Sequence, residues 1–184
     1  MKKLKRTPLL FIFVIMFTSC VKHLDFDQVN DFAPSPIVKS TLVYFTLNQI
    51  DFFDLVNSVE LVTPVDDTSG FTLLSNSFVR NNLLRAELEF EINNQFNRRF
   101  TVNITFLDDN DKITHQFTPI VVNANNANFK QVEKIEIATN PLFLSSKKVR
   151  VSIALSPSTD GSVLDPNQLQ NLVFKSGGTY YLKT

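Results

Sequence analysis

Two stretches in the middle of the chain alternate strictly between apolar and polar residues. The first covers residues 84–92, where apolar Leu84, Ala86, Leu88, Phe90 and Ile92 alternate with Arg85, Glu87, Glu89 and Glu91. The second covers residues 99–106, where apolar Phe100, Val102, Ile104 and Phe106 alternate with Arg99, Thr101, Asn103 and Thr105. Because successive side chains of a β-strand point to opposite faces, each stretch predicts a strand with one buried and one solvated face. Such a sheet needs a second layer to cover its apolar face.

Further strands are predicted on both sides of this pair. They cover residues 37–47, 112–122, 132–138, 149–155, 172–176 and 179–183, and residues 60–65 and 71–74 are short candidates for strands. Residues 37–47 carry apolar side chains at both parities, which predicts a strand covered on both faces. Val132 is out of step with Ile135 and Ile137, which indicates a bulge or a late start of that strand. Turns are predicted at residues 66–70, at residues 108–111 and, as a hairpin, at Gly177-Gly178.

About eight or nine strands with one to three short helical turns predict an all-β fold, an antiparallel β-sandwich. In its general pattern the chain is similar to immunoglobulin-like and fibronectin type III-like domains. The sequence allows two ways of connecting the two alternating strands. In a hairpin, Glu91 would pair with Arg99 and Phe90 with Phe100. In the alternative, the loop carries the chain from one sheet to the other, and both phenylalanines face the core without a backbone ladder between their strands.

The amino-terminal residues have the layout of a signal peptide. Lys2, Lys3, Lys5 and Arg6 precede an apolar run over residues 9–17, and small polar residues follow. As a helix this run would reach only about 14 Å, whereas a bilayer core is about 30 Å thick. The run therefore predicts a removable leader and not a permanent transmembrane anchor.

The sequence Phe17-Thr18-Ser19-Cys20 at the end of this run resembles the lipobox of bacterial lipoproteins. The resemblance implies that the Cys20 thiol receives a diacylglycerol, that the chain is cut before Cys20, and that the new amino group is acylated. Cys20 is the only cysteine of the 184 residues. The alternative is an ordinary thiol at the end of a conventional secretory signal.

These features divide the chain into three segments. Residues 1–19 are the predicted signal peptide, residues 20–35 a lipidated tether, and residues 36–184 the sandwich domain. The resemblance implies attachment to a membrane of the cell envelope through the lipid on Cys20. Because Val21, and not Asp, follows Cys20, the resemblance favours the outer membrane of a Gram-negative bacterium.

Charge and composition predict no nucleic-acid partner, no cofactor and no metal. Four of the 18 Lys and Arg lie in the leader, so the mature chain carries 14 positive against 18 negative charges, a net charge of −4. Residues 108–111 resemble the start of a calcium loop but lack the required Gly and Glu further on. The only histidines are His23 and His115, and His115 is expected to be a packed or rim residue.

No catalytic residues are predicted, and the chain is not expected to be an enzyme. Glu87, Glu89 and Glu91 lie roughly 7 Å apart along one strand face, which an inverting glycosidase pair could use. A regular charged stripe is, however, typical of a solvated face.

The sequence therefore favours a non-catalytic binding or assembly module for an envelope protein of unknown identity. A solute- or glycan-binding lipoprotein is the first alternative, and an envelope hydrolase the second. Tyr44 is expected to be buried, which leaves Tyr180 and Tyr181 as sugar platforms. One of these two tyrosines on the outer face beside a concavity would favour glycan binding. A deep cleft that converges on Glu87, Glu89 or His115 would favour an enzyme.

Overall fold

The computed structural model describes residues 36–61 and 63–183. The predicted signal peptide, Cys20 and the tether lie outside these residues. Within the described part, no helix has the length and apolar character needed to cross a membrane.

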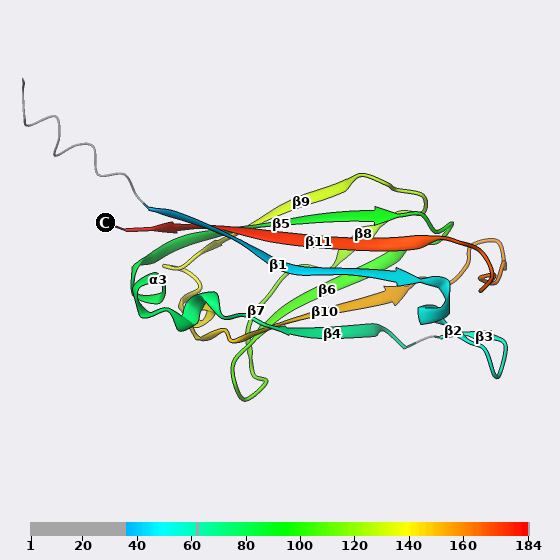
Figure 1. Ribbon diagram of the computed structural model, residues 1–184, viewed down its shortest axis with the longest axis horizontal. Coiled ribbons are helices and arrows are strands. Elements are labelled where there is room, and N and C mark those ends of the chain that lie inside the picture. Colours follow the sequence, from blue (N-terminus) through cyan, green and yellow to red (C-terminus); the bar gives the residue numbers. More distant parts are fainter. Residues whose placement is uncertain (1–35, 62, 184) are drawn as a thin grey trace, which may run out of the picture. The chain divides into compact units, whose positions relative to one another are not determined.

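Two antiparallel sheets pack face to face, which confirms the all-β sandwich (Figure 1). The first sheet has the order β1 (Ile37–Asn48), β11 (Asn171–Leu182), β5 (Leu83–Asn94) and β9 (Phe129–Glu136). The second has the order β4 (Val65–Gly70), β10 (Lys148–Leu155), β6 (Phe100–Leu107) and β7 (Ile113–Gln116), and β8 (Ile120–Val122) also pairs with β6. A small hairpin joins β2 (Phe53–Asp54) to β3 (Val59–Glu60). The short helices are η1 (Gln49–Phe52), η2 (Leu73–Ser75), α3 (Ser77–Asn82) and η3 (Pro141–Ser145), one more than the sequence predicts.

The strand order is that of a jelly roll. If β7 and β8 are counted as one interrupted strand, each sheet has four strands, and the connections cross between the sheets everywhere except between β6 and β7. The immunoglobulin or fibronectin type III-like arrangement is not confirmed. Consecutive strands pair within an immunoglobulin sheet, whereas no pair in the first sheet here joins consecutive strands.

The prediction of a hairpin between the two alternating strands is wrong. The alternative, a loop that carries the chain from one sheet to the other, is confirmed. β5 pairs with β11 and β9, while β6 pairs with β10, β7 and β8 in the other sheet. Glu91 therefore lies opposite Lys175 and Lys130 instead of Arg99. The inward faces are as predicted, with Phe90 and Phe100 both buried.

Leu84 is the exception on the inward face. The pairing of β5 with β11 shifts register between Tyr181 and Leu182, so that Leu182 lies opposite Leu83. This bulge turns Leu83 into the core and leaves Leu84 48% exposed.

A second bulge explains the mixed parity of β1. The register with β11 shifts between Thr41 and Tyr44, which moves the inward positions by one residue. The Ser176 hydroxyl lies inside this bulge. It accepts a hydrogen bond from the Val43 N–H (3.0 Å) and donates one to the Val43 carbonyl (3.2 Å). β1 is therefore covered on one face only, and Tyr44, expected to be buried, is 62% exposed on the outer face.

Several predicted turns and strands are corrected. Residues 66–70 form most of the edge strand β4 and not a turn, and residues 112–122 form two strands interrupted before β8. Residues 61, 63, 64 and 71–74 lie outside the strands. β9 runs from Phe129 with an unbroken register, so Val132 lies on the outer face without a bulge. The turn at residues 108–111 is confirmed, because the Asp108 carboxylate accepts the N–H groups of Asn110 and Lys112 at 2.8 and 2.9 Å.

Gly177 and Gly178 lie inside β11 and form no hairpin. Gly178 points inward under the ring of Tyr180, where an added Cβ would lie 2.3 Å from the Tyr180 hydroxyl oxygen. This close approach requires glycine.

Aromatic rings fill the space between the sheets. Phe106 on β6 is fully buried, and its ring centroid lies 5.1 Å from Phe71, 5.0 Å from Phe143 and 6.2 Å from Phe117. The T-shaped or edge orientation of these pairs is the favourable one. The phenylalanine-rich composition thus serves mainly for packing.

Candidate functional site

Exposed aliphatic side chains gather at one end of the sandwich, here called the loop end. It consists of η1, the β2–β3 hairpin with its turn at residues 55–58, and the loop at residues 156–170 (Figure 1). Each of six aliphatic side chains is at least 51% exposed there: Ile50, Leu55, Val56, Val59, Val163 and Leu169. Val56 and Leu169 are exposed by 90% and 99%. Single exposed apolar residues are ordinary, but a group of them on one surface is typical of an interaction site.

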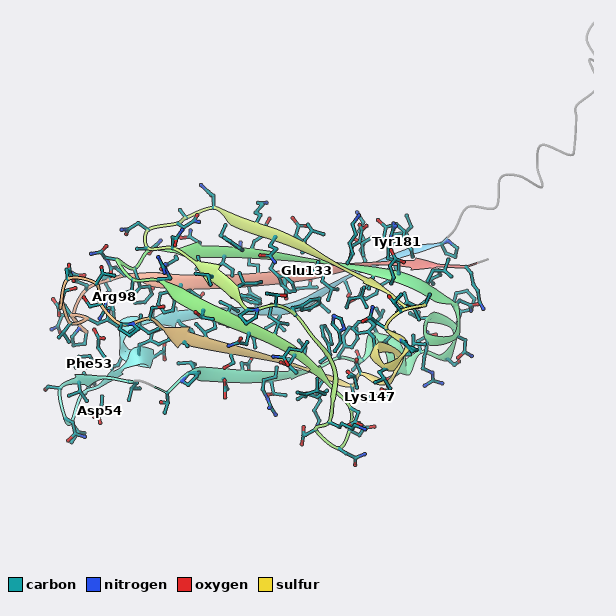
Figure 2. All side chains as sticks on the ribbon, turned by 180° about the vertical axis from the view of Figure 1, so that it is seen from behind. Phe53, Asp54, Arg98, Glu133, Lys147 and Tyr181 are labelled. Carbon is teal, nitrogen blue, oxygen red and sulfur yellow. The ribbon has the colours of Figure 1, made fainter. Side chains whose placement is uncertain are left out.

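Arg98 holds the segments of the loop end together. Its side chain is only 5% exposed and forms an ion pair with Glu60 of β3. The guanidinium also donates to the carbonyls of Ser156 (3.2 Å) and Ser162 (3.1 Å). Glu60 in turn accepts the N–H of Leu164 at 2.7 Å. Figure 2 shows Arg98 at the same end as Phe53 and Asp54 of the hairpin, far from Tyr181.

Two more contacts fix the loops around Arg98. Gln49 and Gln170 bond to each other, with the Gln49 side-chain amide donating at 3.0 Å and the Gln170 N–H donating at 3.2 Å. The buried Asn94 amide donates to the carbonyls of Arg98 and Asn123, both at 2.8 Å. These loops are therefore held by buried and half-buried hydrogen bonds, which give them a defined surface.

Asp54 shapes the tip of the hairpin. Its carboxylate accepts the N–H groups of Val56 (2.9 Å) and Asn57 (3.1 Å) and the Asn57 side-chain amide (2.7 Å). The hydrogen bond from the Asn57 side chain is the main reason that the pKa of Asp54 lies below its usual value. Ser58 completes the turn with a φ of 54°. The turn directs Val56 into solvent.

The loop end is acidic. Residues 48–61 and 156–171 contain Asp51, Asp54, Glu60, Asp160 and Asp165 but no Lys or Arg. Hydrogen bonds from Ser158 and then Ser162 hold the pKa of Asp160 well below its usual value. Since Glu60 is paired with Arg98, the remaining carboxylates give this surface a negative field.

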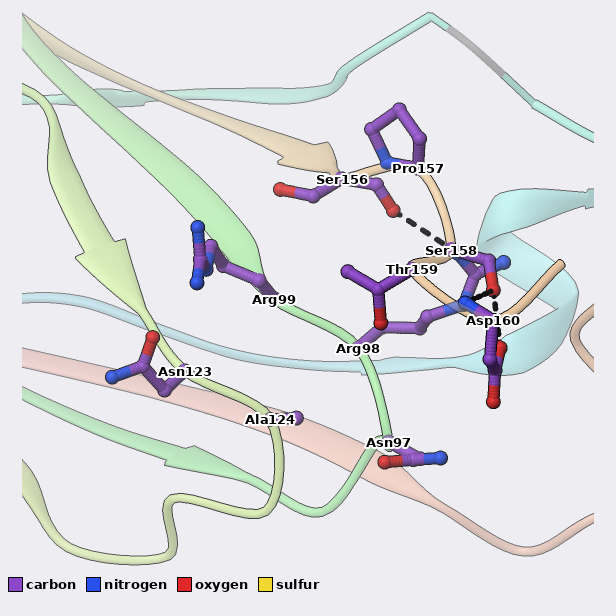
Figure 3. A pocket seen from close by; sticks show the side chains of 10 residues that line it. All are labelled: Asn97, Arg98, Arg99, Asn123, Ala124, Ser156, Pro157, Ser158, Thr159 and Asp160. Atoms are coloured by element: carbon purple, nitrogen blue, oxygen red, sulfur yellow. Dashed lines mark hydrogen bonds between the residues drawn. The ribbon is translucent and has the colours of Figure 1, made fainter. Parts of the chain in front are cut away.

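A polar cavity of about 350 Å³ lies between the start of β6 and the first residues of the loop at residues 156–170 (Figure 3). It is lined by Asn97, Arg98, Arg99, Asn123, Ala124, Ser156, Pro157, Ser158, Thr159 and Asp160. The Arg98 guanidinium faces Ser156 in Figure 3 and is engaged by its partners. The cavity therefore offers hydrogen-bonding groups at the loop of residues 156–170.

The structure places the glutamate stripe and His115 apart from one another, and Cys20, the one predicted site residue, lies outside the described residues. Glu87, Glu89 and Glu91 lie on the outer face of the first sheet, whereas His115 lies on β7 of the second. Glu87 accepts a hydrogen bond from the Tyr181 hydroxyl (2.9 Å), the main reason that its pKa is lowered. The stripe of glutamates is thus a solvated face.

His115 is a packed rim histidine, as predicted. Its ring meets Phe117 edge-on at 4.8 Å and Phe143 at 6.0 Å. Burial lowers the pKa of the imidazole, although the charge of Glu133 acts in the opposite direction. In residues 36–61 and 63–183, no three His, Cys, Asp or Glu side chains are grouped so as to hold a metal ion.

The loop end was not predicted from the sequence. The apolar residues near Val56 have a helix-like spacing, and Arg98 follows a polar loop with nothing to mark it as buried. A signal was present in the loop at residues 156–170, where Val163 and Leu169 stand among polar residues without the period of a strand or helix.

No family model matches the chain, and no characterised protein matches its sequence. Among solved structures, a protein of Parabacteroides distasonis ATCC 8503 is 13% identical with a TM-score of 0.48 over 67% of this chain and 41% of its own. The VP2 subviral particle of infectious bursal disease virus is 8% identical with a TM-score of 0.43, over 82% of this chain and 33% of that one. The chain thus spans less than two thirds of either. Both TM-scores are below 0.5, so the fold assignment rests on the strand order alone.

Proposed function

We propose that this protein is an exported lipoprotein of the cell envelope, held by a lipid on Cys20, whose sandwich serves as a non-catalytic module that binds a protein partner. The observation that carries the proposal is the loop end. Its aliphatic tips are exposed while the loops beneath them are fixed by the Arg98 ion pair. Apolar groups held rigidly in water favour association, because little conformational entropy is lost when a partner covers them.

The charge of the loop end determines the chemistry of the partner. The two segments that carry the aliphatic tips also carry Asp51, Asp54, Asp160 and Asp165, and they contain no Lys or Arg. A second copy of the same surface would be repelled, and so would an anionic lipid surface. The partner that fits is a protein with an apolar patch rimmed by Lys or Arg.

The direction of β1 supports the same proposal. β1 begins at the end of the sandwich opposite to the β2–β3 hairpin (Figure 1). A 12-residue strand spans about 40 Å. A tether that joins the sandwich at Pro36 would thus be connected to the end remote from the loop end, which leaves the loop end available to a partner.

Cross-linking in cells tests this proposal. A photoreactive amino acid at Val56 or Leu169 is expected to capture one common protein, whereas the same group at Phe78 is expected not to. Phe78 is a matched control because it is 56% exposed and lies on α3, away from the loop end. The captured protein is then purified and its affinity for the full chain is measured at several salt concentrations.

The double variant Val56→Asp/Leu169→Asp is expected to weaken binding at least about tenfold, and Phe78→Asp to leave it unchanged. The affinity should also fall as salt rises, since the rim contacts are ionic. Capture of the same protein from all three positions, or from none, would contradict the proposal. Binding of the loop end to neutral lipid vesicles, lost in the double variant, would assign it to a membrane instead.

A further inference from the structure

The outer face of the first sheet has a hollow at Gly177. Two adjoining depressions of about 330 and 350 Å³ share Thr41, Glu89 and Gly177 as lining residues. Together they extend along β11 from Lys175 to Thr179, a length of about 13 Å. Each has a volume within the range of ligand pockets, about 300 to 1,000 Å³.

The register explains why the hollow lies at this place. Outward-facing residues form cross-strand rows, and one row consists of Thr41, Gly177, Glu89 and Val132. Gly177 contributes no side chain to this row, so the backbone of β11 is exposed between the side chains of Thr41 and Glu89. An added Cβ at Gly177 would meet only the Ser40 carbonyl oxygen at 3.5 Å, an ordinary contact. Neither packing nor backbone strain therefore requires glycine at this position, in contrast to Gly178.

An aromatic wall borders the hollow. Tyr44 lines one of the depressions and is 62% exposed, because the β1 bulge turns it to the outer face. The Lys175 ammonium lies 5.9 Å from the centre of its ring. A tyrosine on the outer face beside a concavity is the arrangement by which aromatic rings support the apolar faces of sugars.

The polar groups in the hollow differ in whether they already have a hydrogen bond or an ion pair within the protein. Glu87 is bonded to Tyr181 and lies 3.5 Å from Arg85 and 3.6 Å from Lys134, and Glu91 is paired with Lys130. Glu89 has no hydrogen bond or ion pair with any described residue, and neither does the Thr41 hydroxyl. A free carboxylate and a free hydroxyl thus stand on either side of Gly177.

The surrounding charges nearly cancel. In the cross-strand rows of the hollow, three carboxylates face four lysines, and in the next row Arg85 faces Glu136; the lysines are Lys39, Lys130, Lys134 and Lys175. Such a field selects neither an anion nor a cation, while the free polar groups and the exposed ring favour a ligand with many hydroxyl groups. We infer that the Gly177 hollow binds a neutral oligosaccharide, which lies along β11 with one sugar against Tyr44.

Titration calorimetry on the full chain in detergent tests this inference. The probes are maltohexaose, cellohexaose, xylohexaose and mannohexaose, with the acidic hexamer of galacturonic acid as a charged comparison. Gly177→Thr fills the hollow without removing a hydrogen bond, and Tyr44→Ala removes the aromatic wall. Val132→Thr is the control, because it changes the same cross-strand row outside the hollow. Unchanged urea midpoints establish that each variant is folded.

At least one neutral probe is expected to bind, and both Gly177→Thr and Tyr44→Ala to weaken it about tenfold or more, which corresponds to about 1.4 kcal/mol. Val132→Thr should have no effect. The inference is overturned if no neutral probe binds at millimolar concentration, if only the galacturonate hexamer binds, or if Gly177→Thr binds as tightly as the wild type.

Discussion

Replacement of Phe106 by Ala is expected to lower the free energy of unfolding by about 3 to 5 kcal/mol. Phe106 is fully buried on β6, the strand that pairs with β10, β7 and β8. Its ring contacts Phe71, Phe117 and Phe143, so the substitution removes aromatic contacts as well as apolar volume. The surrounding rings cannot move into the vacated space without losing their own contacts. The substitution is therefore expected to leave a large cavity, and its effect on the free energy of unfolding should be correspondingly large.

Equilibrium unfolding in urea, followed by circular dichroism, measures this loss. Phe78→Ala is the matched control, since Phe78 is 56% exposed and the same change there should cost no more than about 0.5 kcal/mol. If Phe106→Ala cost as little as Phe78→Ala, the rings between the two sheets would not form a packed core.

Arg98→Met is expected to have the second largest effect, a loss of about 2 to 4 kcal/mol. Methionine keeps much of the side-chain volume but leaves the Glu60 carboxylate and the carbonyls of Ser156 and Ser162 without their donor. Breaking a fully buried ion pair costs about 3 to 5 kcal/mol. The expected loss is smaller because the Glu60 side chain remains 22% exposed and water can reach it.

A double-mutant cycle with Glu60→Gln separates the ion pair from the other bonds of Arg98. The glutamine amide would keep an oxygen for the Leu164 N–H but lose the charge. A favourable coupling energy between the two positions, measured by urea unfolding, would establish the pair. A loss below about 1 kcal/mol for Arg98→Met would mean that the loops of the loop end hold their positions without it.

The inward faces of the sandwich could be predicted, because burial on one side of a strand leaves a period of two in the sequence. Phe90 and Phe100 are examples. Their pairing could not be predicted, since a hairpin and a crossing loop place the same residues inward. The jelly-roll order depends on which strand lies beside β5, and β11 takes that place from the far end of the chain.

The other wrong predictions concern segments whose structure depends on tertiary contacts. β4 has no apolar pattern, and its backbone becomes a strand only because β10 offers hydrogen-bonding partners to residues 65–70. Gly177 and Gly178 look like a hairpin turn until the ring of Tyr180 is known to lie over Gly178. Tyr44 looked buried because a bulge, which a single sequence does not mark, changes the parity of β1.

The functional residues also divide into those that a local pattern predicts and those that depend on tertiary contacts. The solvated glutamate stripe and the packed His115 were predictable from their positions on alternating strands. The loop end was not, because it is assembled from three segments separated along the chain, residues 49–60, Arg98 and residues 156–170, whose contacts have no local signature. The Gly177 hollow likewise needs the register of β1, β11 and β5 together.

Attachment through Cys20 would make this sandwich a module of the envelope, and the intact mass of the protein purified from membranes measures it directly. The expected mass is that of residues 20–184 with a diacylglycerol on the Cys20 thiol and a fatty acid on the new amino group. Cys20→Ser should keep residues 1–19 and incorporate no fatty-acid analogue. A wild-type chain with a free Cys20 thiol, or a serine variant that still incorporates the analogue, would contradict the assignment.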